Sequence, residues 1–83
     1  MKVTVRTIGR LNTHLPGGGQ ANRVELEVPA ETTPWDVMRR LGLSEDRLYL
    51  VKVNGAVLPL ARHGAARLKE RDELTILPKP KYG

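Results

Sequence analysis

Few residues of this chain are of a type and spacing that would support catalysis. His14 and His63 are the only histidines, and neither has a partner at the spacing of a metal site or a catalytic pair. There is no cysteine, which removes thiolate ligands and thiol nucleophiles. The acidic residues are explained by helix caps and turns, so we assign no carboxylate pair. We expect no metal site, no bound cofactor, no enzyme activity of the chain alone, and two surface histidines.

The other candidate for chemistry is the end of the chain. Leu74 and Ile76 predict one face of a strand, and Pro78 and Pro80 then remove two backbone donors and stop it. Residues 78–83 would span roughly 20 Å if extended, enough to carry the carboxylate of Gly83 into a pocket of another protein. The alternative is a disordered terminus, the usual fate of final residues.

Length and composition place limits on the rest. Eighty-three residues predict one domain with a modest core, built mainly from Val, Leu and Ile because Phe is absent. No stretch is apolar for long enough to cross a membrane, and no signal peptide is evident. We therefore expect a soluble, cytoplasmic protein.

The chain carries a net charge of +5, from 14 basic and 9 acidic residues. The basic residues are scattered, and no aromatic platform is interleaved with the densest pair, Arg39 and Arg40. This pattern does not favour nucleic-acid binding. It favours a solvated basic surface that steers an acidic partner.

Alternation of apolar and polar residues predicts the strands. Val3 and Val5 mark a half-buried strand at 1–8, and the clearest strand covers 23–28. Residues 48–53 predict a more buried strand. Asn54-Gly55 then predicts a two-residue hairpin turn, with a return edge strand at 56–60 cut by Pro59. The stretch 61–71 reads as irregular, with Leu68 at the end of the core.

One helix is expected between the second and third strands. Thr33 suits the N-cap, Pro34 the first turn, and Gly42 the position after the helix. Trp35, Met38 and Leu41 form its apolar stripe, with Trp35 as a core anchor. Residues 9–22, which contain a triple glycine, read as a flexible connector. They lack the frame of a phosphate-binding loop.

The order of these elements, and the sequence within them, resembles the MoaD/ThiS-like sulfur carriers. These are the small subunit of molybdopterin synthase and its thiamine-pathway counterpart. The matching pieces are MKVTVR at 1–6, IGRL at 8–11, VELEVP at 24–29, the helix at 33–43 ending in LGL, VKVNG at 51–55 and DELTILP at 72–78. The resemblance implies an α+β, ubiquitin-like β-grasp fold, with a mixed four- to five-stranded sheet and one helix packed on one face. Residues 1–77 would form this domain and 78–83 a flexible C-terminal tail.

The resemblance also implies a function. An ATP-dependent adenylating enzyme activates the terminal glycine carboxylate, here Gly83, and a persulfide converts it to a thiocarboxylate. A larger synthase subunit then uses the sulfur in molybdenum or tungsten cofactor assembly. The chain itself would bind no cofactor, because the partner uses the ATP. The partner-binding residues would be Leu77, Pro78, Pro80, Lys81 and Tyr82.

Tyr82 departs from the family, which has a second glycine at this position. Two glycines pass through a narrow channel because they lack side chains. Three interpretations stay open: a partner with a wider channel, a mature chain with a different end, or a chain that keeps the fold but has lost carrier chemistry. The last would be a non-conjugated ubiquitin-like module that binds proteins through its open sheet face.

Overall fold

The computed structural model describes residues 1–8, 22–43 and 49–78. Predictions on His14, the triple glycine at 17–19 and the tail beyond residue 78 lie outside the described residues. Within the described ranges the strands are β1 (Lys2–Thr7), β2 (Arg23–Glu27), β3 (Tyr49–Val53), β4 (Ala56–Leu58) and β5 (Glu73–Pro78). The helices there are α1 (Pro34–Arg40) and the short 3-10 helix η4 (Leu60–Arg62).

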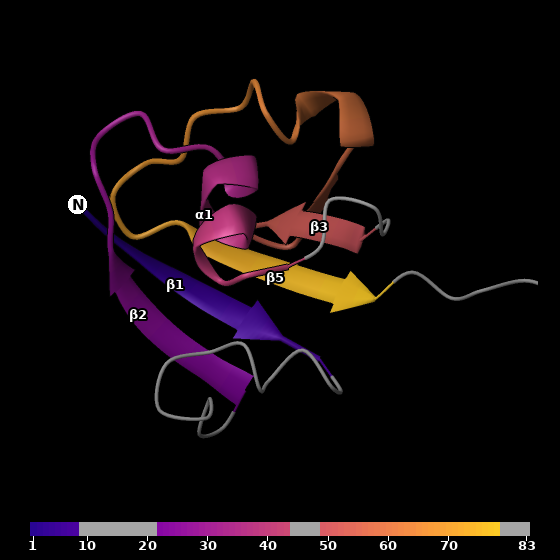
Figure 1. Cartoon of the computed structure of the whole chain (residues 1–83), viewed down its shortest axis with the longest axis horizontal. Coiled ribbons are helices and arrows are strands. Elements are labelled where there is room, and N and C mark those ends of the chain that lie inside the picture. Colours follow the sequence, from indigo (N-terminus) through magenta and orange to yellow (C-terminus); the bar gives the residue numbers. More distant parts are fainter. Residues whose placement is uncertain (9–21, 44–48, 79–83) are drawn as a thin grey trace, which may run out of the picture.

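The five strands form one mixed sheet in the order β2-β1-β5-β3-β4. β1 and β5 are parallel neighbours, with Val5 beside Leu74, and every other pair is antiparallel. Figure 1 shows β1 and β5 pointing the same way, with α1 lying across the sheet. The predicted β-grasp fold, with one helix on one face of a mixed sheet, is therefore confirmed.

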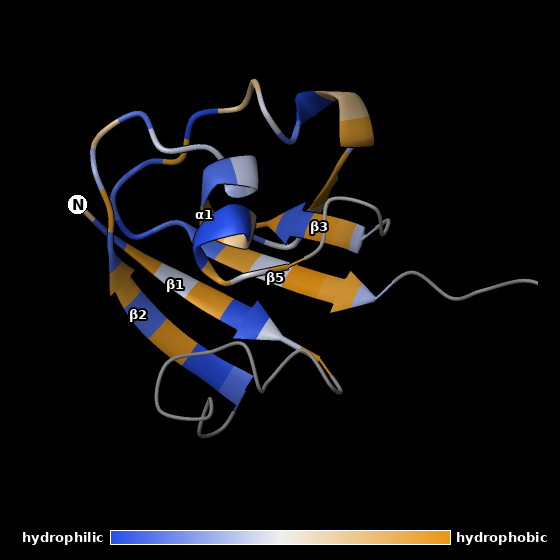
Figure 2. Cartoon of the chain, in the orientation of Figure 1, coloured by the Kyte–Doolittle hydropathy of each residue, from blue (hydrophilic) through white to orange (hydrophobic). Residues whose placement is uncertain are grey.

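The core lies between α1 and the face of the sheet that the helix covers. Val3, Val5, Leu74 and Ile76 have at most 1% of their surface exposed. β1 and β2 alternate between apolar and polar residues, as predicted, whereas β5 is mostly apolar (Figure 2). The alternation follows from the pleat, because only one of the two faces is covered.

The expectation of a more buried third strand is wrong. Val51 is fully buried, but Leu50 is exposed, and Tyr49, Lys52 and Val53 are only half-buried. β3 lies one strand from the edge of the sheet, and the face on which Leu50 and Lys52 lie has no helix over it in the described chain. Apolar composition alone did not show that one side of this strand faces outwards.

The start of α1 matches the expectation from sequence. The Asp36 backbone N–H donates to Thr33 Oγ1 at 3.2 Å, and the Thr33 N–H donates to Asp36 Oδ2 at 3.1 Å. This reciprocal pair is a capping box that satisfies two otherwise unpaired donors. Pro34 occupies the first helical position, where no donor is needed.

The end of α1 is fixed by Gly42, whose φ is +77°. The Gly42 N–H donates to the Arg39 carbonyl and the Leu43 N–H to the Met38 carbonyl, both at 3.0 Å. These bonds form a Schellman motif, which requires a left-handed residue after the helix. Leu43 and Met38 are both buried, which supplies the apolar contact typical of this motif.

The buried face of α1 differs in detail from the predicted stripe. Pro34, Val37, Met38 and Leu41 are buried, whereas Trp35 packs against the core but stays half-buried.

Within the described ranges, no helix has the length and apolar character needed to cross a membrane.

The hairpin turn is as predicted. Asn54 and Gly55 both have positive φ, +52° and +85°, which is the geometry of a type I′ turn. β4 returns for only three residues and ends before Pro59, at an edge of the sheet. Leu68 is 4% exposed, so its predicted place in the core is confirmed.

Candidate functional site

β5 is the element that leads to the end of the chain. It is paired on both sides, with β1 and with β3, and Leu74 and Ile76 have no exposed surface. Pro78 is exposed and lies opposite Tyr49 as the last residue of the strand. The strand is therefore held from both sides as far as Ile76, and Leu77 and Pro78 are held by β3 alone up to the point where the predicted tail begins.

The six predicted site residues divide at this point. Leu77 and Pro78 are described and lie together at the end of β5. Leu77 alternates with the buried Ile76 and is half-buried on the opposite face, as expected. Pro80, Lys81, Tyr82 and Gly83 lie outside the described residues, and their roles stay predictions.

An apolar patch surrounds Leu77 on the uncovered face of the sheet. Leu50 lies directly opposite Leu77, and Val57 is diagonal to Leu50 on the neighbouring strand. Leu50 is 36% exposed and Val57 57%. Ile8, which is 48% exposed, comes directly after β1. It is two residues beyond Arg6 and so continues the same face of the strand. We call these four residues, Ile8, Leu50, Val57 and Leu77, the apolar corner.

A row of positive charge runs beside the apolar corner. Arg23 lies opposite Arg6, Arg6 lies next to Thr75, and Thr75 lies opposite Lys52. Arg6 Nη1 is 3.5 Å from Glu73 Oε1, but neither Arg23 nor Lys52 has an ion pair among the described residues. Like charges directly opposite on a sheet are destabilising. This row therefore suits an acidic partner that also presents apolar side chains.

His63 is not on the surface, which corrects the expectation. It is 3% exposed, and its Nε2 lies 3.0 Å from the Leu58 carbonyl oxygen. Its own carbonyl accepts from the Trp35 N–H at 2.9 Å, which ties η4 to the start of α1. A buried imidazole is tolerated where it is hydrogen-bonded. We therefore assign His63 a structural role.

The described residues do not assemble a catalytic or metal-binding cluster. No three His, Cys, Asp or Glu side chains in residues 1–8, 22–43 and 49–78 come together as metal ligands would. The Thr33 backbone N–H, and next the Arg39 guanidinium, hold the pKa of the Asp36 carboxyl below its ordinary value. Asp36 is thereby engaged in capping α1, with Arg39 Nη2 at 2.7 Å from its Oδ1.

Sequence reasoning missed most of the apolar corner. Only Leu77 was singled out, whereas Leu50 was assigned to a more buried strand and Val57 to a return strand without a role. The available signal was the pairing register: a turn at Asn54-Gly55 places Lys52 opposite Val57, so both face the same side. A charged residue on that face indicates that it is not the core.

Comparisons with known proteins find the same architecture among solved structures. No protein-family model matches the chain, and no curated protein matches it in sequence. Among solved structures, SAMP1 from Haloferax volcanii, a small archaeal modifier protein, superposes with a TM-score of 0.69 at 18% identity, over 100% of both chains. A candidate molybdopterin converting factor subunit 1 from Pyrococcus furiosus gives 0.68 at 18% identity, over 94% of this chain and 97% of that one.

A third solved structure is a complex of two proteins. It contains subunits 1 and 2 of the molybdopterin-converting factor from Helicobacter pylori. Its similar chain gives a TM-score of 0.61 at 17% identity, with 100% of both chains covered. At these identities the likeness establishes the shared fold, which is that of the MoaD/ThiS-like, ubiquitin-like proteins.

Proposed function

We propose that this chain is a sulfur-carrier-like protein of the molybdopterin synthase small-subunit type. The observation that most supports this is the position of β5. A central strand, paired with β3 as far as Pro78, ends beside an exposed apolar corner, and five further residues lead to Gly83. A folded domain that presents a docking surface at the start of a short tail suits a carrier whose C-terminal carboxylate is modified by another protein.

The proposed chemistry uses only the carboxylate of Gly83. An ATP-dependent adenylating enzyme joins this carboxylate to AMP and releases pyrophosphate. A persulfide sulfur then displaces AMP, and reduction of the sulfur–sulfur bond by a thiol leaves the thiocarboxylate. Pro80, Lys81 and Tyr82 would line the partner's channel. The chain supplies the electrophile, and the partners supply the catalysis and bind the ATP.

The apolar corner would be the docking surface for these partners. Leu77 and Pro78 continue directly into the tail, so a protein that covers this corner is separated from Gly83 by no more than five residues of chain. The assembly of a similar chain with a second subunit in the Helicobacter pylori complex supports a larger synthase subunit as one such partner. Molybdenum or tungsten cofactor assembly is the corresponding pathway.

Loss of carrier chemistry is the alternative. The same open face, with its basic row and apolar corner, also suits a non-conjugated ubiquitin-like module that binds an acidic partner. In that case Gly83 and Tyr82 would be dispensable, whereas the sheet face would still be required.

An ATP–pyrophosphate exchange assay with an adenylating enzyme from the same source separates the two functions. The carrier function predicts exchange that depends on this chain and is abolished when Gly83 is deleted. Exchange that survives the deletion, or binding of the enzyme without any exchange, would favour the binding module instead. Leu50→Ser is assayed in parallel to test the docking surface, because both functions predict that this variant binds its partner more weakly.

A further inference from the structure

β2 forms one edge of the sheet, and its hydrogen-bonding phase can be read from one pair of residues. The Met1 amino group donates to the Val28 carbonyl, and the Val28 N–H donates to the Met1 carbonyl, both at 2.8 Å. Hydrogen-bonded and non-hydrogen-bonded pairs alternate along an antiparallel ladder. The inward-bonded residues of β2 are therefore Leu26 and Val24. The residues whose backbone groups point outwards are Arg23, Glu25 and Glu27.

Arg40 confirms this phase and partly blocks the edge. Its Nη1 donates to the Glu27 carbonyl at 2.6 Å, so that carbonyl points away from β1. The guanidinium occupies the acceptor that an added strand would use. For Glu25, no described residue bonds to the outward backbone N–H or carbonyl. Charged side chains that cover an unpaired edge strand commonly prevent uncontrolled pairing with other strands.

The opposite edge of the sheet, at β4, has fewer outward-pointing backbone groups. The two-residue turn makes Val53–Ala56 the first hydrogen-bonded pair of the β3–β4 hairpin and Val51–Leu58 the next. Only Val57 then points its backbone groups outwards, and the strand ends before Pro59. The edge at β2 is therefore the one on which an extended segment can form several bonds.

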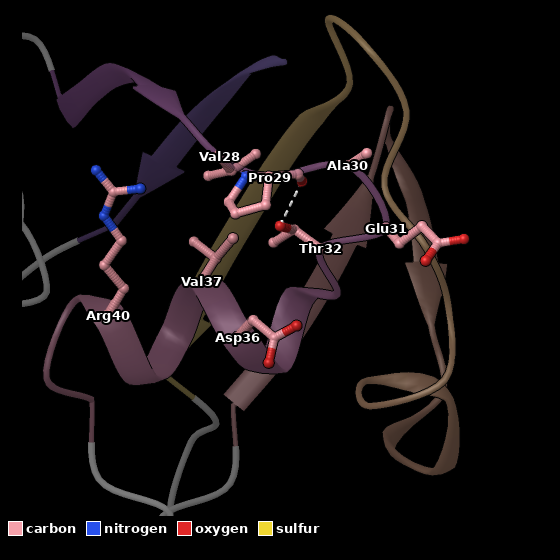
Figure 3. A pocket seen from close by; sticks show the side chains of 8 residues that line it. All are labelled: Val28, Pro29, Ala30, Glu31, Thr32, Asp36, Val37 and Arg40. Carbon is pink, nitrogen blue, oxygen red and sulfur yellow. Dashed lines mark hydrogen bonds between the residues drawn. The ribbon is translucent and has the colours of Figure 1, made fainter.

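A pocket of about 260 Å³ adjoins the C-terminal end of this edge, between the chain after β2 and the first turns of α1 (Figure 3). Apolar atoms of Val28, Pro29 and Val37 line it. Thr32 also lines it, but its hydroxyl donates to the Pro29 carbonyl at 2.6 Å and is satisfied within the chain. The interior therefore suits an aliphatic side chain.

The rim of the pocket is charged unequally. Figure 3 shows Arg40 on the side nearest β2, whereas Asp36 and Glu31 lie towards the other side. An acidic group beside Arg40 gains a charge-assisted hydrogen bond, but the same group beside Asp36 or Glu31 is repelled. The rim thus distinguishes the two ends of a bound segment.

We propose that the β2 edge and this pocket bind an extended peptide as a sixth strand. An aliphatic side chain of the peptide fills the pocket, and an acidic side chain two residues away, on the same face, pairs with Arg40. The occupant is an extended peptide because only an extended backbone presents donors and acceptors at the spacing of Arg23, Glu25 and Glu27. Arg40 releases the Glu27 carbonyl when the peptide binds.

This surface is separate from the one in the proposed function. The pocket lies on the α1 side of the sheet, whereas Leu77 and the rest of the apolar corner lie on the face away from α1. A peptide on β2 leaves that corner and the end of β5 uncovered. The inference therefore stands or falls independently of sulfur transfer.

The probes are three heptapeptides capped at both ends. The first is Ser-Asp-Thr-Val-Thr-Val-Ser, the second has lysine in place of aspartate, and the third has proline at its third and fifth positions, which keeps both valines. Each is titrated into the full chain labelled with ¹⁵N. We expect saturable shifts at the amides of Glu25, Glu27, Val28 and Val37 for the first peptide, half complete below about 1 mM. The lysine peptide should bind about two- to fivefold more weakly, and the proline peptide should not bind, because it lacks the donors.

Two variants locate the site. Glu25→Pro removes an outward N–H without removing a bond to β1, so it should fold and lose the peptide, whereas Glu25→Ala should bind as the parent does. Arg40→Gln keeps an amide donor near Glu27 but no charge, so the preference for the acidic peptide should disappear. Absence of saturable shifts, shifts confined to the apolar corner, or equal binding of the proline peptide would overturn the proposal. The proline peptide decides the question even if Glu25→Pro does not fold.

Discussion

Leu77 lies directly opposite Leu50 where β5 pairs with β3, and both side chains are on the face of the sheet away from α1. Leu50 precedes the hairpin at Asn54-Gly55 in the chain, whereas Leu77 is the last apolar residue before the tail. The pairing register therefore builds an apolar surface at the place where the chain leaves the sheet. A partner that covers these two residues contacts the chain six residues before the predicted reactive Gly83.

Removal of apolar side chains from this surface should weaken partner binding. Leu50→Ser and Val57→Ser are each expected to weaken the affinity for the adenylating enzyme about tenfold, typical of a moderate interface contact. The free energy of unfolding should change by less than about 0.5 kcal/mol for the exposed Val57. Isothermal titration calorimetry and thermal unfolding measure the two effects.

The matched control is Leu60→Ser. Leu60 is as exposed as Val57, at 57%, but it lies in η4 and not on the sheet face. It should leave the affinity unchanged. If Leu60→Ser weakens binding as much as Val57→Ser does, the docking surface is not the apolar corner.

Local patterns were enough to predict most of the fold. The period of two in β1 and β2, the cap at Thr33 and the turn at Asn54-Gly55 each depend on near neighbours in the chain, and each is confirmed. The pairing of β1 with β5 joins residues about seventy positions apart. No local pattern indicates such a contact, and here only the resemblance to a known family predicted it.

The errors in prediction concern residues whose environment is set by segments far away in the chain. The burial of Leu50 and His63 depends on distant segments. Over the sheet face that carries Leu50 the described residues contain no helix, and His63 is held at the start of α1 by the bond from the Trp35 N–H to its carbonyl. An apolar strand sequence and a histidine in a loop sequence do not carry that information. The candidate site was predicted only in part for the same reason, since the apolar corner is created by strand register.

His63 should matter for stability. His63→Ala removes the hydrogen bond to the Leu58 carbonyl and leaves a cavity, so the free energy of unfolding should fall by about 2 kcal/mol. In a domain of this size that corresponds to a fall in Tm of roughly 10 °C. Arg62→Ala, at the exposed neighbouring position, should change the unfolding free energy by less than about 0.5 kcal/mol. Equal stability of the two variants would show that His63 is not a structural contact.

The cap of α1 should make stability depend on acid pH. The pKa of Asp36 is lower in the folded chain than its ordinary value of 3.8, so the unfolded state binds a proton more readily. The contribution of Asp36 is thus complete at neutral pH and is lost as the pH falls below 3.8 through the folded pKa.

Asp36→Asn tests this assignment. The parent should be more stable than the variant at about pH 6, and the difference should close towards about pH 2. Chemical denaturation at a series of pH values provides the curves. A difference that stays constant with pH would mean that the Asp36 charge is not responsible for the stabilisation.

Tyr82 should determine which adenylating enzyme accepts the chain. Carriers of the resembling family end in two glycines, which suit a narrow channel because glycine has no side chain. We expect an adenylating enzyme that serves a Gly-Gly carrier to reject the parent chain and to accept Tyr82→Gly. Pyrophosphate release measures both reactions, with Tyr82→Ala as an intermediate control. Equal activity of the parent and Tyr82→Gly with that enzyme would show that the ring does not obstruct the channel.

The central claim, that the carboxylate of Gly83 is converted to a thiocarboxylate, is tested most directly by intact mass. The chain is incubated with its adenylating enzyme, ATP and a persulfide donor. Replacement of one oxygen by sulfur should add about 16 Da to the parent, and nothing to a chain from which Gly83 has been deleted. An unchanged parent mass under conditions that convert a carrier from a relative, or the same gain in the deleted chain, would contradict the claim.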